Sequence, residues 1–265
     1  MYSPLRLAAK FIRYYITASN GKGHGIHSPF AFDFITNVLN DKRKFYAYTA
    51  IENCRNHLLA DNSLLEMTDF GAGSVTGNKK QRSVSAIANN AAKPKKFGQL
   101  LFRVANYYKP VSMIELGTSL GLSAAYLAMG NPAAKLITFE GASAVAAVAI
   151  ENFSLLDIRN IETTEGNFDE TLPVVLKNIA AVDLVFIDGN HRAAPTLRYF
   201  EQFLQKISRP GILIFDDIHW SKEMESAWKE IKNHPEVMLT IDLFFIGLVF
   251  FSRDFKVKQH FVIRF

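Results

Sequence analysis

The segment VSMIELGTSLGLSAAYLAMG, residues 111–130, decides the fold that we expect. It opens with a short apolar run at 111–116, passes through a glycine-containing turn, and continues at 121–130 as a helix pattern that ends on Gly130. A strand that leads through glycines into a helix is typical of nucleotide-binding units, because glycine lets the backbone approach the ligand and the helix N-terminus faces it. The segment therefore predicts a cofactor loop at residues 115–123.

Strand-like and helix-like patterns alternate on the C-terminal side of this segment. Nearly all-apolar strands separated by helices predict a parallel sheet that is covered on both faces. The last two strands follow one another without room for a helix, so they are predicted to pair antiparallel. The fold class is therefore α/β: a Rossmann-like, doubly wound, mostly parallel seven-stranded sheet with a C-terminal antiparallel hairpin. The expected strands are 111–116, 135–140, 160–166, 182–189, 209–217, 237–244 and 246–252.

Residues 1–105 lack this alternation and differ in charge. Helices are expected at 28–40, 48–67 and 83–94. Residues 1–110 hold 16 Lys or Arg against 6 Asp or Glu, whereas the remainder of the chain is net acidic. We predict a basic, mainly helical N-terminal cap at 1–105 and a cofactor-binding domain at 106–265. The basic surface is compatible with nucleic acid, acidic lipid, the acidic half of the chain, or solvent alone.

A second glycine stretch, TDFGAGSVTG at 68–77, competes for the cofactor. It is followed by a polar, basic segment with no acid-terminated strand, whereas the strand after the first loop ends on Glu140. An acidic residue at that place bonds ribose hydroxyls in nucleotide folds. We therefore assign the cofactor to 115–123. The stretch 69–82, with Lys79, Lys80 and Arg82, is interpreted either as a loop that offers amides and positive charge to an anionic substrate or as a plain connection.

The loop reads E-x-G-x-S-x-G through Glu115, Gly117, Ser119 and Gly121. This pattern resembles the first motif of class I S-adenosylmethionine-dependent methyltransferases. The likeness extends over roughly 106–255, since VDLVFIDGNHRAAPTLRYFE and LQKISRPGILIFDDIHW resemble the group that reads I-D-G-x-H after the fourth strand and F-D-D after the fifth. That layout is similar to metal-dependent catechol-type O-methyltransferases.

The resemblance implies roles for individual residues. Glu115 would help to hold the methionine end of S-adenosylmethionine, Glu140 would bind the ribose, and Asn167 and Phe168 would border the adenine. The family more often has Asp at the position of Asn167. The full set of expected cofactor-binding residues is Glu115, Gly117, Thr118, Ser119, Gly121, Ser123, Glu140, Gly141, Asn167, Phe168 and Asp188.

Three carboxylates are expected at the carboxyl ends of two neighbouring strands. Asp188, Asp216 and Asp217 would repel one another without a cation, and oxygen ligands suit Mg²⁺ or another divalent cation. They are our candidate metal ligands. His191 lies where the similar enzymes carry a lysine base, and His219 follows the Asp pair. The candidate catalytic residues are thus His191, Asp188 and His219, with helix capping or a surface position as the structural alternative.

The function we predict is S-adenosylmethionine-dependent O-methylation of a small-molecule hydroxyl, assisted by a divalent metal in one version of the mechanism. The alternatives are an RNA methyltransferase that uses the basic N-terminal half, a non-catalytic cofactor-binding protein, and, more weakly, an NAD-dependent oxidoreductase. An anionic substrate and a homodimer remain open. The single cysteine, Cys54, and the interrupted apolar runs at the N-terminus lead us to expect a cytoplasmic protein.

Overall fold

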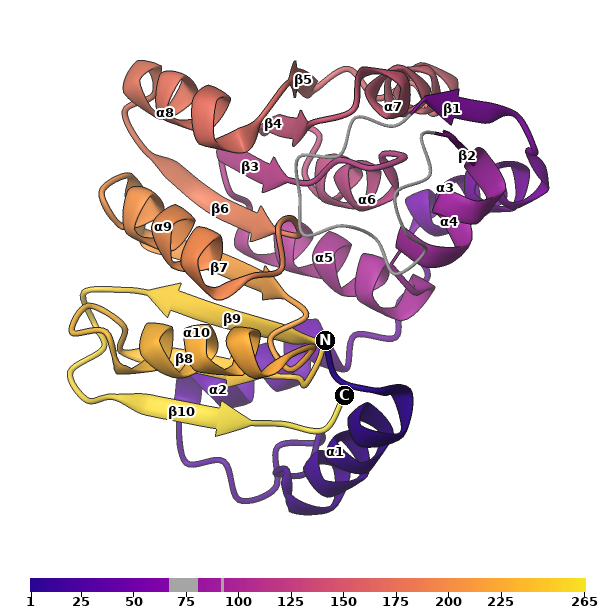
Figure 1. The fold of residues 1–265 in the computed structure, drawn as a ribbon. Coiled ribbons are helices and arrows are strands. Elements are labelled where there is room, and N and C mark those ends of the chain that lie inside the picture. The colour runs from indigo at the N-terminus through magenta and orange to yellow at the C-terminus, as the bar shows by residue number, and fades with distance from the viewer. Residues whose placement is uncertain (67–80, 92) are drawn as a thin grey trace. The chain divides into compact units, whose positions relative to one another are not determined.

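A computed structural model of the chain describes residues 1–66, 81–91 and 93–265 (Figure 1). They form two compact units. The first consists of Met1–Asp41 together with Ala181–Phe265, and the second of Lys42–Ala180. These units divide the chain by packing, whereas the division at residue 105 rests on charge and periodicity and stays a prediction. Within the described residues, no helix is both long and apolar enough to cross a membrane.

The second unit contains a parallel sheet of three strands. β3 (Ser112–Leu116) pairs with β4 (Lys135–Glu140), which pairs in turn with β5 (Ile161–Glu165). Helices connect and cover these strands, as Figure 1 shows. They are α5 (Lys95–Tyr108), α6 (Leu122–Gly130), α7 (Ser143–Leu155) and α8 (Phe168–Asn178).

Small residues let α5 and α6 approach each other closely. A Cβ atom on Gly130 would lie 2.7 Å from the Phe102 carbonyl oxygen, and one on Gly98 would overlap the Tyr126 ring. Tyr126 is fully buried, and its hydroxyl donates a hydrogen bond to Glu52 at 2.7 Å. Glu52 belongs to α3 (Tyr46–Ala60), which therefore joins the same core.

The predicted helix at 48–67 is too long. α3 ends at Ala60, and Asp61 accepts a hydrogen bond from the Ser63 backbone amide in a tight turn. A short strand follows, β1 (Leu64–Glu66), and it pairs antiparallel with β2 (Gln81–Ser83) before α4 (Val84–Ala91). The aspartate competes for backbone amides and stops the helix, which an apolar pattern alone did not indicate.

The first unit contains a mixed sheet in the order β10-β8-β9-β7-β6. β6 and β7 are parallel, whereas β9 runs antiparallel to both β7 and β8, so the predicted C-terminal hairpin is confirmed. All seven predicted strands occur as β3 to β9. The short β10, parallel to β8, was not predicted. The bounds are β6 (Val182–Ile187), β7 (Ile207–Asp216), β8 (Leu239–Asp242), β9 (Ile246–Phe251) and β10 (Gln259–Val262), with helices α9 (Ala193–Leu204) and α10 (Lys222–Asn233).

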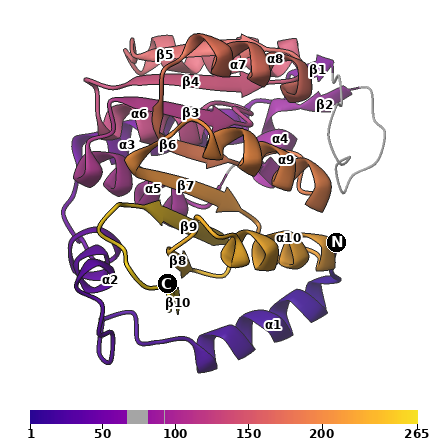
Figure 2. The same cartoon turned by 90° about the vertical axis from the view of Figure 1, so that its left-hand side faces the viewer.

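The beginning of the chain packs on its end. α1 (Pro4–Thr17) starts at the cap Ser3, and the hydroxyl of its buried Tyr14 donates to the Ile263 carbonyl and accepts from the Phe265 amide at 3.1 Å. Figure 2 shows α1 beside the C-terminus. The next segments are α2 (Pro29–Phe34) and the π-helix η1 (Ile35–Leu39), within the helix expected at 28–40.

Candidate active site

The predicted cofactor loop is a strained turn between β3 and α6. Gly117 has a φ of 104°, Ser119 of 47° and Gly121 of 84°, all in the left-handed region that favours glycine. At Gly121 there is also no space, because a Cβ atom would lie 2.6 Å from the Phe153 ring. The amides of Gly117 and Thr118 both donate to the Phe139 carbonyl, so the neighbouring strand β4 fixes the start of the turn.

Glu115, which precedes the turn, is completely buried. Burial raises the pKa of its carboxyl to about 7, although hydrogen bonds from Thr138 and Ser123 act in the opposite direction. The Thr138 hydroxyl donates to Oε2 at 2.6 Å. Oε1 is buried and has no hydrogen-bond partner among the described residues. Such an unsatisfied buried acceptor is costly unless a ligand or water pairs with it.

Glu140 lies at the end of β4, where the sequence predicted a ribose ligand. Its Oε2 accepts from the Ser119 amide at 2.8 Å, and its Oε1 accepts from the Ala142 amide at 3.0 Å. Burial raises the pKa of this carboxyl, and the backbone hydrogen bonds partly offset the effect. Glu140 therefore holds the glycine turn in place. Each carboxylate oxygen keeps capacity for a second donor.

Asn167 and Phe168 lie at the start of α8, beside the end of β4. The Asn167 side-chain oxygen accepts from the Asp169 amide at 3.0 Å and caps the helix. Its carbonyl is therefore already used by the protein, which the sequence interpretation did not foresee, although Asn followed by acidic residues is a helix-start signal. The Phe168 ring contacts the Phe139 ring edge to face, with 6.4 Å between centroids.

In the first unit, three of the predicted residues meet at the carboxyl ends of β6 and β7. Asp188, His191 and Asp216 each offer a ligand atom, and these atoms all lie within 4.8 Å of one another. His191 Nε2 is 3.6 Å from an Asp188 oxygen. Asp216 is almost completely buried, whereas the other two are partly exposed. Two carboxylates and an imidazole in this arrangement suit a divalent cation.

Asp217 is not part of this cluster, in contrast to the predicted metal trio. The residue has a φ of 53° and forms a turn, in which its amide donates to the Phe245 carbonyl and its own carbonyl accepts from the Trp220 amide. Adjacent residues at a strand end point in different directions, so only one of the two aspartates joins Asp188. His191 takes the third position.

His219, the second candidate base, is held between two carboxylates. Its Nδ1 lies 3.1 Å from Glu225 and its Nε2 lies 2.9 Å from Asp242. Its ring stacks on Phe244 at 5.2 Å. Burial favours the neutral ring, but the two carboxylates outweigh it and raise the pKa of His219. Because both ring nitrogens are engaged, the geometry favours a role in holding the fold.

The sequence interpretation missed the network around His219. Asp242 also accepts from the indole of Trp228 at 3.0 Å, while Glu225 accepts from Tyr2 at 2.7 Å and pairs with Lys10 at 2.9 Å. The available signal was the acidic residue in the otherwise uncharged strand LTID, since a buried charge needs partners. The network fastens α1 to α10.

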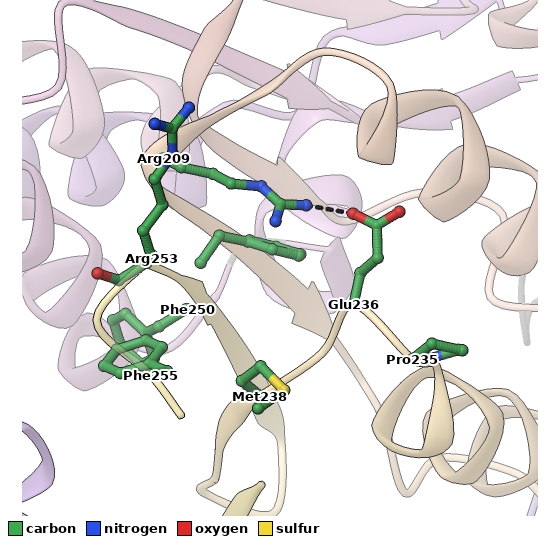
Figure 3. Close-up of a pocket in the computed structure, with 9 residues that line it drawn as sticks. Arg209, Pro235, Glu236, Met238, Phe250, Arg253 and Phe255 are labelled. Carbon is green, nitrogen blue, oxygen red and sulfur yellow. Dashed lines mark hydrogen bonds and ion pairs between the residues drawn. The ribbon is translucent and has the colours of Figure 1, made fainter. Parts of the chain in front are cut away.

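A separate cavity of about 390 Å³ lies near the opposite end of β7. Figure 3 shows Arg209, which forms an ion pair with Glu236, above a wall of Phe250, Phe255 and Met238. None of the predicted site residues lines this cavity. It therefore gives no support to the predicted site.

The comparisons with known proteins agree with the resemblance that the sequence motifs indicated. Residues 114–218 match the family described as a methyltransferase domain. No curated protein matches the chain. The range that matches includes Glu115 and the Asp188, His191 and Asp216 cluster.

Several solved structures share the fold. A methyltransferase of Podospora anserina, solved with SAH, has a TM-score of 0.59 and 15% identity, and the match covers 85% of this chain and 97% of that one. An O-methyltransferase of Streptomyces achromogenes involved in tomaymycin synthesis, solved with SAM, has a TM-score of 0.54 and 20% identity over 62% of this chain and 82% of that one. An O-methyltransferase of Bacillus cereus, solved with SAH, has a TM-score of 0.53 and 17% identity over 82% and 96%.

Proposed function

We propose that the protein transfers the methyl group of S-adenosylmethionine to a hydroxyl of a small molecule, with the help of a divalent cation. The match of residues 114–218 to a methyltransferase domain supports the reaction type. The choice of a hydroxyl acceptor rests on one observation, the cluster of Asp188, His191 and Asp216. A cation held by these residues would lower the pKa of a hydroxyl that binds to it. The similar solved structures that contain SAM or SAH support S-adenosylmethionine as the cofactor.

The residues around the glycine turn suit this cofactor. Glu115 offers an unpaired, buried carboxylate oxygen, which fits the positively charged amino group of the methionine part. Glu140 retains acceptor capacity for the ribose hydroxyls. The Ser119 amide donates a hydrogen bond to Glu140 and thereby fixes the position of the turn relative to this carboxylate. Phe168, whose ring contacts the Phe139 ring, would offer an apolar edge to the adenine.

S-adenosylmethionine supplies an electrophilic methyl group on a positively charged sulfur. Transfer breaks the bond between sulfur and methyl carbon, whose electron pair stays on sulfur, and forms a bond between the acceptor oxygen and that carbon. The acceptor must lose its proton, and the protein needs a group that takes it. We assign this role to the Nε2 atom of His191. The cation would then be held by the carboxylates of Asp188 and Asp216, because one nitrogen cannot bind a cation and take a proton at once.

Two calorimetric titrations test the cofactor assignment. We expect SAH to bind and NAD not to bind, and Glu140→Gln to weaken SAH by about tenfold, the equivalent of one charged hydrogen bond. Binding should also weaken as the pH falls through about 7, because the Glu115 carboxyl then takes up a proton. Binding of NAD in preference to SAH contradicts the proposal.

Methyl transfer to a panel of small hydroxyl compounds, with RNA as a further substrate, tests the reaction. We expect a chelator to lower the rate and Mg²⁺ or Mn²⁺ to restore it. Asp216→Asn should abolish this restoration. Its matched control is Asp217→Asn, because Asp217 lies next in the chain but outside the cluster. A rate that is unaffected by the chelator refutes the role of the cation, and transfer to RNA alone refutes the small-molecule acceptor.

A further inference from the structure

The helix α1 carries two apolar faces, and the first unit covers one of them. Leu7, Phe11 and Tyr14 pack on Phe244 and Phe245. Residues that are three, four or seven apart share a helix face. Leu5, Ile12 and Ile16 lie on another face, and their exposed fractions are 85%, 59% and 69%. A water-exposed stripe of this length on an anchored helix requires an explanation.

Positive charge borders this exposed stripe on both sides. Arg6 and Arg13, both exposed, are seven residues apart and form a row on one side. Arg264 lies on the other side, where its guanidinium stands 5.2 Å above the centre of the Tyr15 ring. The first acidic residue of the whole chain is Asp33. The helix therefore presents apolar side chains between cations, with no acid of its own.

The helix is held so that this stripe stays outward. Lys10, the remaining cation of α1, pairs with Glu225 at 2.9 Å. The Tyr2 hydroxyl donates to the same carboxylate, and the Tyr2 backbone amide donates to the Trp220 carbonyl at 3.0 Å. Tyr14 bonds the chain segment at Ile263 and Phe265. These contacts fix the rotation of α1 about its axis, and Figure 2 shows the helix along one margin of the first unit.

We propose that the outward face of α1, formed by Leu5, Ile12, Tyr15 and Ile16 with Arg6, Arg13 and Arg264, binds the surface of a membrane rich in anionic lipids. An interfacial helix buries its apolar side chains among the lipids, while flanking cations attract the negatively charged headgroups. Nucleic acid would use the arginines but not the aliphatic stripe. A second copy of the chain would oppose two sets of arginines to each other. The anionic lipid surface satisfies both the apolar and the charged side chains.

Co-sedimentation with lipid vesicles tests this inference on the full chain. We expect binding to vesicles that contain phosphatidylserine and much weaker binding to phosphatidylcholine alone. The double variant Arg6→Gln/Arg13→Gln should weaken binding by about thirtyfold, from about 1 kcal/mol for each basic residue near such a surface. Ile12→Asn should weaken it by about tenfold or more. The matched control is Leu155→Asn, which changes an exposed aliphatic residue at the end of α7 and should leave binding unchanged.

Further measurements distinguish the anionic membrane from the two other possible partners, nucleic acid and a second copy of the chain. Size-exclusion chromatography and far-ultraviolet circular dichroism of each variant show whether its fold and oligomeric state are retained. The inference is overturned if the folded parent ignores phosphatidylserine vesicles, if Ile12→Asn binds them as the parent does, or if Ile12→Asn converts a dimer into a monomer. Binding to single-stranded RNA without binding to vesicles also overturns it. None of these outcomes depends on methyl-transfer activity.

Discussion

Replacing His219 by glutamine should destabilise the first unit, and should do so more at low pH than at high pH. In the folded protein the ring bridges Asp242 and Glu225 at 2.9 and 3.1 Å. Glutamine is close in size but has no charge to offer. The Asp242 carboxylate, which is nearly buried, keeps the donors from Trp228 and the Phe244 amide. The substitution therefore removes one charged partner and leaves the carboxylate otherwise satisfied.

The magnitude follows from what is lost. A hydrogen bond to a charged group contributes about 1.5–3 kcal/mol to stability. The buried bond to Asp242 contributes this full amount to stability. The bond to Glu225 is partly exposed and contributes less. We expect a loss of about 2 kcal/mol, which for a chain of this size lowers Tm by about 4–8 °C.

The pH dependence has a definite sign. The pKa of His219 is raised in the folded state, so its contribution is complete below the unfolded pKa of about 6.5 and is lost as the pH rises through the folded value. Burial opposes ionisation of Asp242 and Glu225, but their partners lower both pKa values, so these carboxylates stay ionised in this window. The difference in Tm between parent and variant should shrink between about pH 6 and pH 9.

Thermal unfolding of parent and variant, followed by circular dichroism at about pH 6 and about pH 9, measures the difference in Tm. Comparing parent and variant removes the contribution of Glu115, which titrates in the same range in both proteins. His234→Gln is the control, because the carboxylate that lies beside the His234 ring, that of Glu201 at 3.7 Å, is exposed. An equal loss of Tm at both pH values, or an equal effect of the control, would show that His219 does not bridge the two carboxylates as a cation.

Three further predictions concern the glycine turn, the possible cation ligands and the ion pair of α1. Gly121→Ala should destabilise the second unit by about 1–3 kcal/mol and weaken SAH, because of the positive φ and the overlap with Phe153, and chemical denaturation with calorimetry measures both effects. Direct Mn²⁺ binding, followed by electron paramagnetic resonance, should be lost in Asp216→Asn and retained in Asp217→Asn; equal loss in both would place Asp217 among the ligands. Lys10→Met should lower Tm by about 1–3 °C at low salt and less at high salt, since the pair with Glu225 is partly exposed and screened.

The sequence was most informative where local rules and periodicity agree. The glycines at 117 and 121 indicated a turn, and the structure gives both the left-handed backbone that favours glycine. The alternation of apolar strands and helices predicted β3 to β9 and the final hairpin, because each pattern reflects burial of a whole element. β10 was not predicted because its four residues are too few to show a period and none of them is fully buried.

What the sequence determined by itself is the strand, glycine turn and helix at 111–130, since these follow from local backbone geometry. Which side chains share a place was decided only by the tertiary structure. Pairing of β6 with β7 brings His191 to Asp188 and Asp216, and a left-handed turn removes Asp217 from them. His219 looked like a free base in the sequence, yet packing of α10 and β8 surrounds it with two carboxylates. Partners that lie far apart in the chain are set by packing, which no local pattern records.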